Sequence, residues 1–354
     1  MQEAQNREVQ PPSRYWRRML VVGAAAGLVV GGLSACGSQQ ETTEMPRGVQ
    51  LPYPESSGPA TPKLLLATYN VMLQSAADDY PNAGSMEERT GRALQVLLAR
   101  QPDIVAFQEL NEESYGFVTT HFPGYKFWPA TYDGEGHTGP RPLAYKASEF
   151  TAVGGGSYKI SRYCKVSGMP SVLLESQEFG ELAVLNFHPS NQGPNPNPCA
   201  TEGSKKDDGS VTRLDSAKRA VAAQQAMTEG NSLPISSVVM CDCNATNHIR
   251  TNNGKDGTMS LEELPESIFE QAGLANTFRL AQERIGDEYS TVSNSITEIK
   301  SGAVEGRTRL DNIYFRPAPG MKTIVYKWEN LVDASTAGIS DHRPVFATVD
   351  TEPE

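Results

Sequence analysis

The chain contains a series of short apolar runs of strand length, and a polar side chain stands at the end of each. Residues 64–70 and 103–109 are two such runs, which close on the amide of Asn70 and the carboxylate of Glu109. A continuous apolar run of this length is typical of a strand that is buried on both faces. Polar residues also adjoin the other predicted strands, at His188, Asp242 with Asn244, Asp311, and Asp341 with His342.

Helical patterns alternate with these strands. Residues 87–100 place leucines at helical spacing before Pro102, and residues 214–227 and 267–272 are two further predicted helices. Residues 171–175 and 182–188 are expected to form a hairpin. Strands mixed with helices indicate α/β or α+β packing. Because ligands bind beyond strand ends in sheets covered by helices, we expect the polar residues to converge there.

The first part of the chain reads as an export signal. Arg17 and Arg18 precede the apolar residues 19–33, and small residues then precede Cys36. This layout resembles a bacterial lipobox, which implies a signal peptide over residues 1–35, lipidation of Cys36 and anchoring at the outer face of the bacterial cell membrane. The alternative is an uncleaved transmembrane anchor, although the apolar run is shorter than the roughly 20 residues that span a bilayer. Residues 36–62 have the composition of a flexible tether.

The remaining residues, 63–354, are long enough for one large domain. The chain has a net charge of −11, which disfavours a broad electrostatic grip on nucleic acid. It does not exclude a nuclease with a local metal site that holds phosphate.

Four cysteines follow Cys36. In an exported protein an even number suggests disulfides, and we expect Cys164 to pair with Cys199, since both lie in loops around the strand that ends at His188. Cys241 and Cys243 stand two residues apart on a predicted strand. We expect them to point to opposite faces and to be poor partners for each other. No C-x-x-C pair is present, which disfavours a zinc–thiolate site.

Six short motifs together resemble the endonuclease/exonuclease/phosphatase superfamily and occur in the order of that family. They are Thr68-Tyr69-Asn70, Phe107-Gln108-Glu109, Asn186-Phe187-His188, Asp242-Cys243-Asn244, Arg309-Leu310-Asp311-Asn312 and Ser340-Asp341-His342. The resemblance implies a four-layer sandwich, in which two mixed β-sheets pack face to face with helices outside. It also implies hydrolysis of a phosphate ester with a divalent metal, usually Mg²⁺, with Mn²⁺ or Ca²⁺ as alternatives.

The resemblance further implies roles for the polar residues. Glu109 would be the main metal ligand, supported by Asn70 and Asp341, since Mg²⁺ prefers hard oxygen ligands. His342, oriented by Asp311, would be the general base for an attacking water. The remaining roles fall to Asp242, which would align or deprotonate the water, Asn244, which would donate to the phosphate, and His188, which would donate to the phosphate or protonate the leaving oxygen.

Several alternatives stay open. Either His342 or Asp242 could take the proton, and Asp311 with His342 could be a purely structural pair. Where this family commonly has Gly-Asp-Phe-Asn, the chain has cysteines on both sides of Asp242. His137, in a glycine-rich loop, is a further residue that could touch substrate.

We therefore predict a metal-dependent phosphoesterase that is tethered outside the cell and acts on nucleic acid. The alternatives are a phosphoesterase acting on a lipid head group or a small phosphorylated molecule, and a surface binding lipoprotein without turnover. The expected partners are the phosphate-ester substrate and, through the lipid anchor, the membrane. Nothing in the sequence indicates an obligate protein partner.

Overall fold

The computed structural model describes residues 63–77, 83–132, 141–162, 165–189, 210–229, 234–245, 248–250, 256–258, 264–292 and 309–354. Contacts separate Met1–Leu51 from Pro52–Glu354, and every described residue belongs to the second unit. The predicted signal and tether lie outside the described residues, as do Cys36, His137, Cys164 and Cys199. Among the helices that are described, none is long and apolar enough to cross a membrane.

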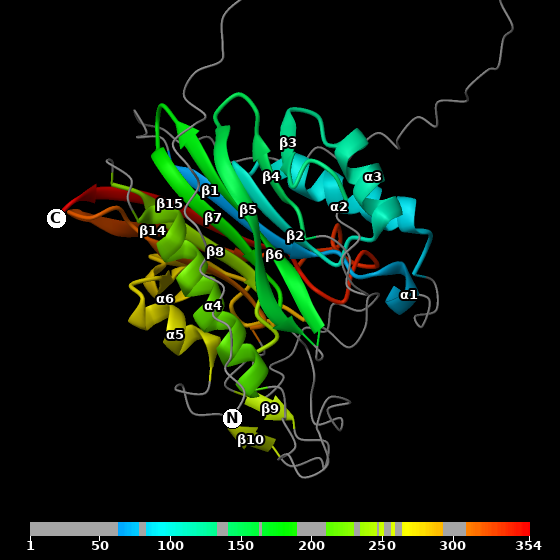
Figure 1. Ribbon diagram of the computed structural model, residues 1–354. Coiled ribbons are helices and arrows are strands. Elements are labelled where there is room, and N and C mark those ends of the chain that lie inside the picture. The colour runs from blue at the N-terminus through cyan, green and yellow to red at the C-terminus, as the bar shows by residue number, and fades with distance from the viewer. Residues whose placement is uncertain are drawn as a thin grey trace, which may run out of the picture. The chain divides into compact units, whose positions relative to one another are not determined.

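Two mixed β-sheets form the centre of the fold (Figure 1). The first has the strand order β12-β14-β15-β1-β2-β4-β3. Its strands are β1 (Leu64–Asn70), β2 (Ile104–Gln108), β3 (Tyr125–Trp128), β4 (Leu143–Lys146), β12 (Glu283–Ile285), β14 (Met321–Asn330) and β15 (Val345–Pro353). β1 pairs in parallel with β2 and antiparallel with β15, which makes the sheet mixed.

The second sheet has the order β11-β13-β8-β7-β6-β5. Its strands are β5 (Thr151–Arg162), β6 (Lys165–Ser176), β7 (Gly180–Phe187), β8 (Ser236–Asp242), β11 (Ala275–Asn276) and β13 (Asp311–Arg316). β7 and β8 are parallel, and β8 and β13 are antiparallel. A separate pair consists of β9 (His248–Arg250) and β10 (Asp256–Thr258).

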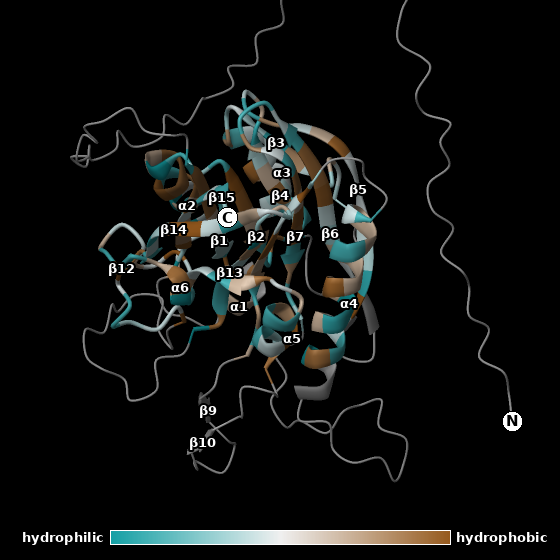
Figure 2. Cartoon of the chain, turned by 90° about the vertical axis from the view of Figure 1, so that its left-hand side faces the viewer, coloured by the Kyte–Doolittle hydropathy of each residue, from teal (hydrophilic) through white to brown (hydrophobic). Residues whose placement is uncertain are grey.

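Helices α2 (Met86–Arg100) and α3 (Glu112–His121) cover the outer face of the first sheet, and α4 (Ser210–Thr228) and α5 (Pro265–Gln271) cover that of the second. Two short helices, α1 (Gln74–Ala77) and α6 (Thr277–Leu280), lie elsewhere, and Phe278 of α6 packs against the core between the sheets. Figure 2 shows alternating hydrophobic and hydrophilic bands along α4, as expected of a helix with one face on a sheet.

Three apolar layers hold the four layers of secondary structure together. Leu66 of β1 and Val184 of β7 belong to the core between the two sheets. Leu97 of α2 packs in a second cluster on the outer face of the first sheet. Ala220 of α4 and Phe269 of α5 pack in a third, on the outer face of the second sheet. The predicted four-layer sandwich of two mixed sheets is therefore confirmed.

The sequence analysis missed several elements, among them α3, β3 and β14. The segment of α3 contains Gly116 and threonines, so its helical pattern is weak. A reciprocal capping box between Asn111 and Ser114 satisfies its first backbone donors and helps the helix to start. The predicted hairpin around Phe179 is confirmed as the antiparallel pair β6–β7.

Candidate active site

The polar strand ends meet at one end of the space between the two sheets. Side chains alternate along a strand, so residues two apart share a face. On β1, Leu66 lies in the core between the sheets, and Thr68 and Asn70 follow on the same face. On β8, Met240 lies in that core and Asp242 follows it. The apolar core between the sheets thus becomes polar at this end.

Asp242 lies at the centre of the cluster and is almost fully buried. Its Oδ2 accepts a hydrogen bond from Asn70 Nδ2 at 3.0 Å and lies 3.3 Å from His188 Nε2 and 3.8 Å from His342 Nε2. Its Oδ1 accepts from the backbone N–H of Asn244 at 3.0 Å. Burial raises the pKa of the Asp242 carboxyl, but His342, His188 and Asn70 together outweigh this effect and hold the pKa well below its usual range.

Glu109 follows β2 and faces the same cluster. Its Oε1 lies 3.9 Å from His188 Nε2, and its Oε2 accepts from the backbone N–H of Leu73 at 3.1 Å. The backbone of Glu109 has a φ of 63°, in the left-handed region that residues with a Cβ avoid. Met72 (φ 61°) and Asn244 (φ 48°) share this conformation beside the site. Such strained residues collect at functional sites, where the surrounding contacts hold them in place.

His342 and Asp311 form a buried pair, with 2.8 Å between His342 Nδ1 and Asp311 Oδ2. Burial lowers the pKa of the His342 imidazole, but the carboxylates of Asp311, Asp242 and Asp341 raise it well above its ordinary value. Because Nδ1 faces a carboxylate, its proton is retained there. The raised pKa favours the charged ring, and when the ring is neutral, Nε2, which lies 3.8 Å from Asp242 Oδ2, is the nitrogen that can accept a proton.

Ser340 joins the first and last of the sequence motifs. Its hydroxyl donates to the backbone carbonyl of Asn70 at 2.8 Å and accepts from the backbone N–H of His342 at 3.1 Å. The same hydroxyl lies 3.3 Å from Asp341 Oδ1. Burial raises the pKa of the Asp341 carboxyl, and the neighbouring charges of Glu109 and Asp242 raise it further.

The cluster offers donors that suit a divalent cation. Ligand atoms of Glu109, His188 and Asp242 lie within 4.8 Å of one another, as do those of Asp242, Asp311 and His342. Carboxylate oxygens are the ligands that Mg²⁺ and Ca²⁺ prefer. A cation beside these oxygens would also offset the repulsion that raises the pKa of Asp341. The residues therefore fit a divalent metal.

The predicted ligand Asn70 is less available than its position suggests. Its Oδ1 already accepts the backbone N–H of Met72 at 2.9 Å, and its Nδ2 donates to Asp242. Asn244 also uses its side chain locally, since Nδ2 donates to the carbonyl of Pro189 at 3.1 Å. Both amides fix the loops that surround Asp242.

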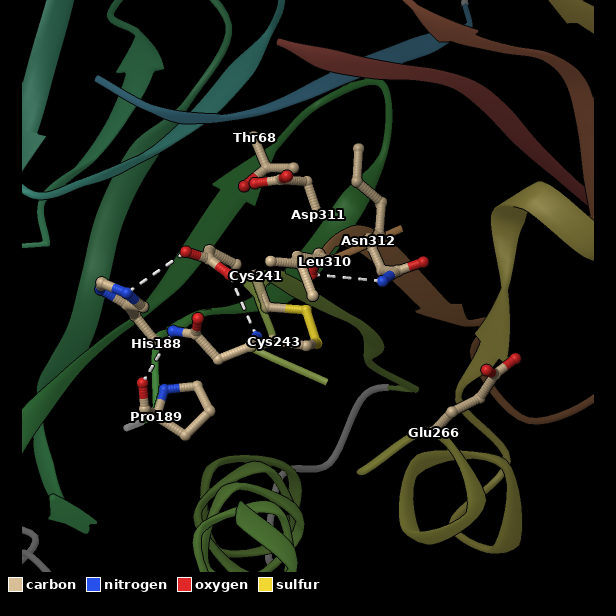
Figure 3. Close-up of a disulfide and its surroundings, with 12 residues drawn as sticks. Thr68, His188, Pro189, Cys241, Cys243, Glu266, Leu310, Asp311 and Asn312 are labelled. Carbon is tan, nitrogen blue, oxygen red and sulfur yellow. Dashed lines mark hydrogen bonds and ion pairs between the residues drawn. A yellow bond between two sulfur atoms is a disulfide. The ribbon is translucent and has the colours of Figure 1, made fainter. Parts of the chain in front are cut away.

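Cys241 and Cys243 form a disulfide, with their Cα atoms 5.0 Å apart. The expectation that they are poor partners is wrong. Residues two apart on a strand point to the same face, and both cysteines lie in the apolar cluster beneath α4 and α5. β8 ends at Asp242, and the Cα separation lies within the range that a disulfide needs. Figure 3 shows this bond between His188 on one side and Asn312 on the other.

The structure adds residues whose roles the sequence analysis did not identify. Thr291 Oγ1 accepts the backbone N–H groups of Leu310 and Asp311 at 3.0 and 3.2 Å, which fixes the start of β13. Arg141 Nε donates to His188 Nδ1 at 3.3 Å. No local pattern in the sequence distinguishes Thr291 or Arg141 from an ordinary loop residue.

Asn186 joins the two sheets beneath the site. Its Nδ2 donates to the backbone carbonyls of Phe107, Arg141 and Pro142 at 2.7, 2.9 and 3.2 Å. Its Oδ1 accepts from Gln108 Nε2 at 2.8 Å, and both side chains are fully buried. The amide therefore connects β7 with the segments that carry Glu109 and Arg141.

We expect Asn186→Ala to lower the free energy of unfolding by about 2–3 kcal/mol, because it removes the buried hydrogen bonds that Asn186 donates to three backbone carbonyls and accepts from Gln108. Urea unfolding followed by circular dichroism measures the change. Gln225→Ala, on the exposed side of α4, is the control and is expected to change stability by less than about 0.5 kcal/mol. Equal effects of the two substitutions would contradict this account.

Comparisons with solved structures identify the fold. An endonuclease/exonuclease/phosphatase from Bacteroides vulgatus matches with a TM-score of 0.60 and 16% identity, over 82% of this chain and 100% of that chain. The mannosyl-6-phosphatase Bt3783 of Bacteroides thetaiotaomicron matches with a TM-score of 0.57 and 15% identity, over 81% and 99%. TDP2 from D. rerio, in complex with a single-strand DNA product, matches with a TM-score of 0.53 and 14% identity, over 81% and 99%.

No family model matches the sequence, and a comparison with curated proteins finds no match. The chain has the fold of the endonuclease/exonuclease/phosphatase structures.

Proposed function

We propose that the chain is a divalent-metal-dependent phosphoesterase whose centre is the cluster around Asp242. The observation that carries this proposal is the convergence of two histidines and an asparagine on one buried carboxylate, beside the more exposed carboxylate of Glu109. A structural role does not require this many ionisable groups in one buried place, since each costs free energy to desolvate. Perturbed pKa values at such a cluster are typical of catalytic sites.

The site has a natural division between a proton acceptor and a proton donor. His342, with its Nδ1 held by Asp311, would take a proton from the attacking water through Nε2. Asp242 is the weaker base, because its pKa is held low, and would align the water. His188 would donate a hydrogen bond to the phosphate or to the leaving oxygen, and Asn244 would donate to a non-bridging oxygen of the phosphate.

Glu109 and Asp341, with Asn70 in support, would hold the metal, which we propose to be Mg²⁺, with Mn²⁺ and Ca²⁺ as alternatives. When bound, the cation would offset the negative charge that develops on the phosphate oxygens and the leaving group. Glu109 is the strongest candidate, because its carboxylate faces the cluster and its backbone is held in a strained conformation there.

For the biological setting we propose an exported lipoprotein, anchored through Cys36, that cleaves extracellular nucleic acid. The export layout of residues 1–36 supports the location, and the neighbour solved with a DNA product supports the substrate class. A small phosphorylated molecule is the second candidate. It is favoured by the net charge of −11, which does not suit a long polyanion, and by the neighbour named as a mannosyl-6-phosphatase.

The test is a substrate panel assayed with the full chain in mild detergent. Plasmid DNA, RNA, sphingomyelin, inositol phosphates and mannose 6-phosphate are each incubated with Mg²⁺ or with a chelator. Metal-dependent turnover of one class, lost in His342→Ala, is the expected result and identifies the substrate class. Folded protein that turns over no phosphate ester in the panel would overturn the proposal and favour the binding-lipoprotein alternative.

A further inference from the structure

Arg141 is a buried cation directly behind one of the two histidines of the site. Its side chain is 2% exposed and lies in the segment that leads into β4. Arg141 Nε donates to His188 Nδ1 at 3.3 Å, and one of its terminal nitrogens, Nη1, donates to the carbonyl of Gly168 on β6 at 2.9 Å. The guanidinium is therefore anchored to the second sheet while it contacts the imidazole.

This contact determines which nitrogen of His188 bears the proton. A guanidinium nitrogen can only donate a hydrogen bond, so Nδ1 of His188 must present its lone pair to Arg141. The ring proton must then be on Nε2, the atom that faces Asp242 Oδ2 at 3.3 Å and Glu109 Oε1 at 3.9 Å. The contacts of Nε2 with Asp242 and Glu109 are to acceptors, which agrees with a proton at this position.

The two histidines of the site are thus held in opposite tautomers, with the proton of the neutral ring on Nδ1 in His342 and on Nε2 in His188. His342 Nδ1 faces the Asp311 carboxylate, an acceptor, so Nδ1 retains its proton and Nε2 is the nitrogen that accepts a proton whenever the ring is neutral. His188 Nδ1 faces a donor, Arg141, which makes its Nε2 a donor. The partner of Nδ1 therefore determines what Nε2 can do in each ring. With Asp311 at Nδ1, His342 can accept a proton at Nε2, and with Arg141 at Nδ1, His188 can donate a hydrogen bond from Nε2.

We propose that Arg141 is a positioning residue that selects the His188 tautomer with the proton on Nε2, so that the ring presents an N–H to an oxygen of the phosphate ester. This inference rests on the proposed phosphoesterase function for its consequence in turnover. The tautomer itself is a property of the protein alone and is measured without substrate.

Two substitutions isolate the contact. In Arg141→Gln, the side-chain amide nitrogen takes the place of Arg Nε, because both atoms follow Cδ, and it still has a proton to donate. In Arg141→Met, a methyl group occupies that place and donates nothing. Both variants lose the guanidinium charge and every hydrogen bond of its terminal nitrogens, the one to Gly168 included, so they differ mainly in the donor to His188 Nδ1.

The first readout is the ¹⁵N spectrum of protein labelled at histidine, with the His188 signals assigned by their loss in His188→Gln. We expect Nδ1 of His188 to be of the unprotonated type in the native protein and in Arg141→Gln, and to move toward the protonated type in Arg141→Met. A protonated Nδ1 in the native protein, or identical spectra of the two variants, would overturn the proposal.

The second readout is turnover of the substrate found in the panel. Loss of a residue that orients a ligand or catalytic histidine typically costs about 10–100-fold, so kcat of Arg141→Met is expected to fall by that factor with KM and the Mg²⁺ dependence little changed. Arg141→Gln is expected to recover most of the loss. Equal losses in both variants would mean that the donor to His188 Nδ1 does not account for the effect, and that Arg141 acts through other contacts of its guanidinium, such as that with Gly168. Absence of turnover in the native protein would instead refute the phosphoesterase, and the tautomer result would stand on its own.

Discussion

His342→Ala is expected to lower kcat for the phosphate ester by about 10²- to 10⁴-fold, the range that a general base contributes. The substitution removes the Nε2 atom, 3.8 Å from Asp242 Oδ2, that would take the proton of the attacking water. Steady-state rates at saturating substrate measure the effect. His121→Ala is the matched control, because His121 is exposed on α3, where its ring stacks on Phe117.

A double-mutant cycle tests whether Asp311 acts through His342. Asp311→Asn alone is expected to reduce kcat strongly, since Asp311 Oδ2 holds the Nδ1 proton at 2.8 Å. In the His342→Ala background the same change is expected to cost little more, because coupled residues are not additive. Additive losses would contradict the claim that Asp311 acts through His342. Full activity of His342→Ala, with an unchanged circular dichroism spectrum, would show that His342 is not the general base.

Glu109→Gln is expected to abolish metal-dependent turnover, with a loss of about 100-fold or more in kcat/KM at a fixed Mg²⁺ concentration. The amide keeps the shape of the side chain but removes the negative charge that would hold the cation. Isothermal titration calorimetry with Mg²⁺ is expected to show a matching loss of metal affinity. A chelator should reduce the native protein to the level of the variant.

Glu113→Gln is the matched control for that experiment. Glu113 is exposed in the first turn of α3, a few residues beyond Glu109 in the chain, so its neutralisation alters the local charge equally without altering the site. Native metal affinity in Glu109→Gln would show that the cation is held by other residues. Equal losses in Glu109→Gln and Glu113→Gln would indicate a general electrostatic effect.

The sequence by itself determined the strands that carry the candidate site and the position of polar residues at their ends. Alternation places Leu66, Thr68 and Asn70 on one face of β1, and Met240 and Asp242 on one face of β8, because this period depends only on neighbouring residues. The pattern was therefore sufficient to predict α/β or α+β packing and a polar cluster at the strand ends, whereas the two mixed sheets were implied by the resemblance to the endonuclease/exonuclease/phosphatase superfamily. The same alternation, applied correctly, also places Cys241 and Cys243 on one face, so their pairing could have been predicted from the sequence.

Other features became visible only in the tertiary structure. The contact of Arg141 with His188 joins residues 47 positions apart, and that of Asn70 with Asp242 joins residues 172 apart. No local pattern encodes such contacts, because they depend on how one sheet lies over the other. The residue types at the strand ends indicated the chemistry, whereas the tautomer of each histidine was decided by the residue that packing placed behind it, a carboxylate for His342 and a guanidinium for His188.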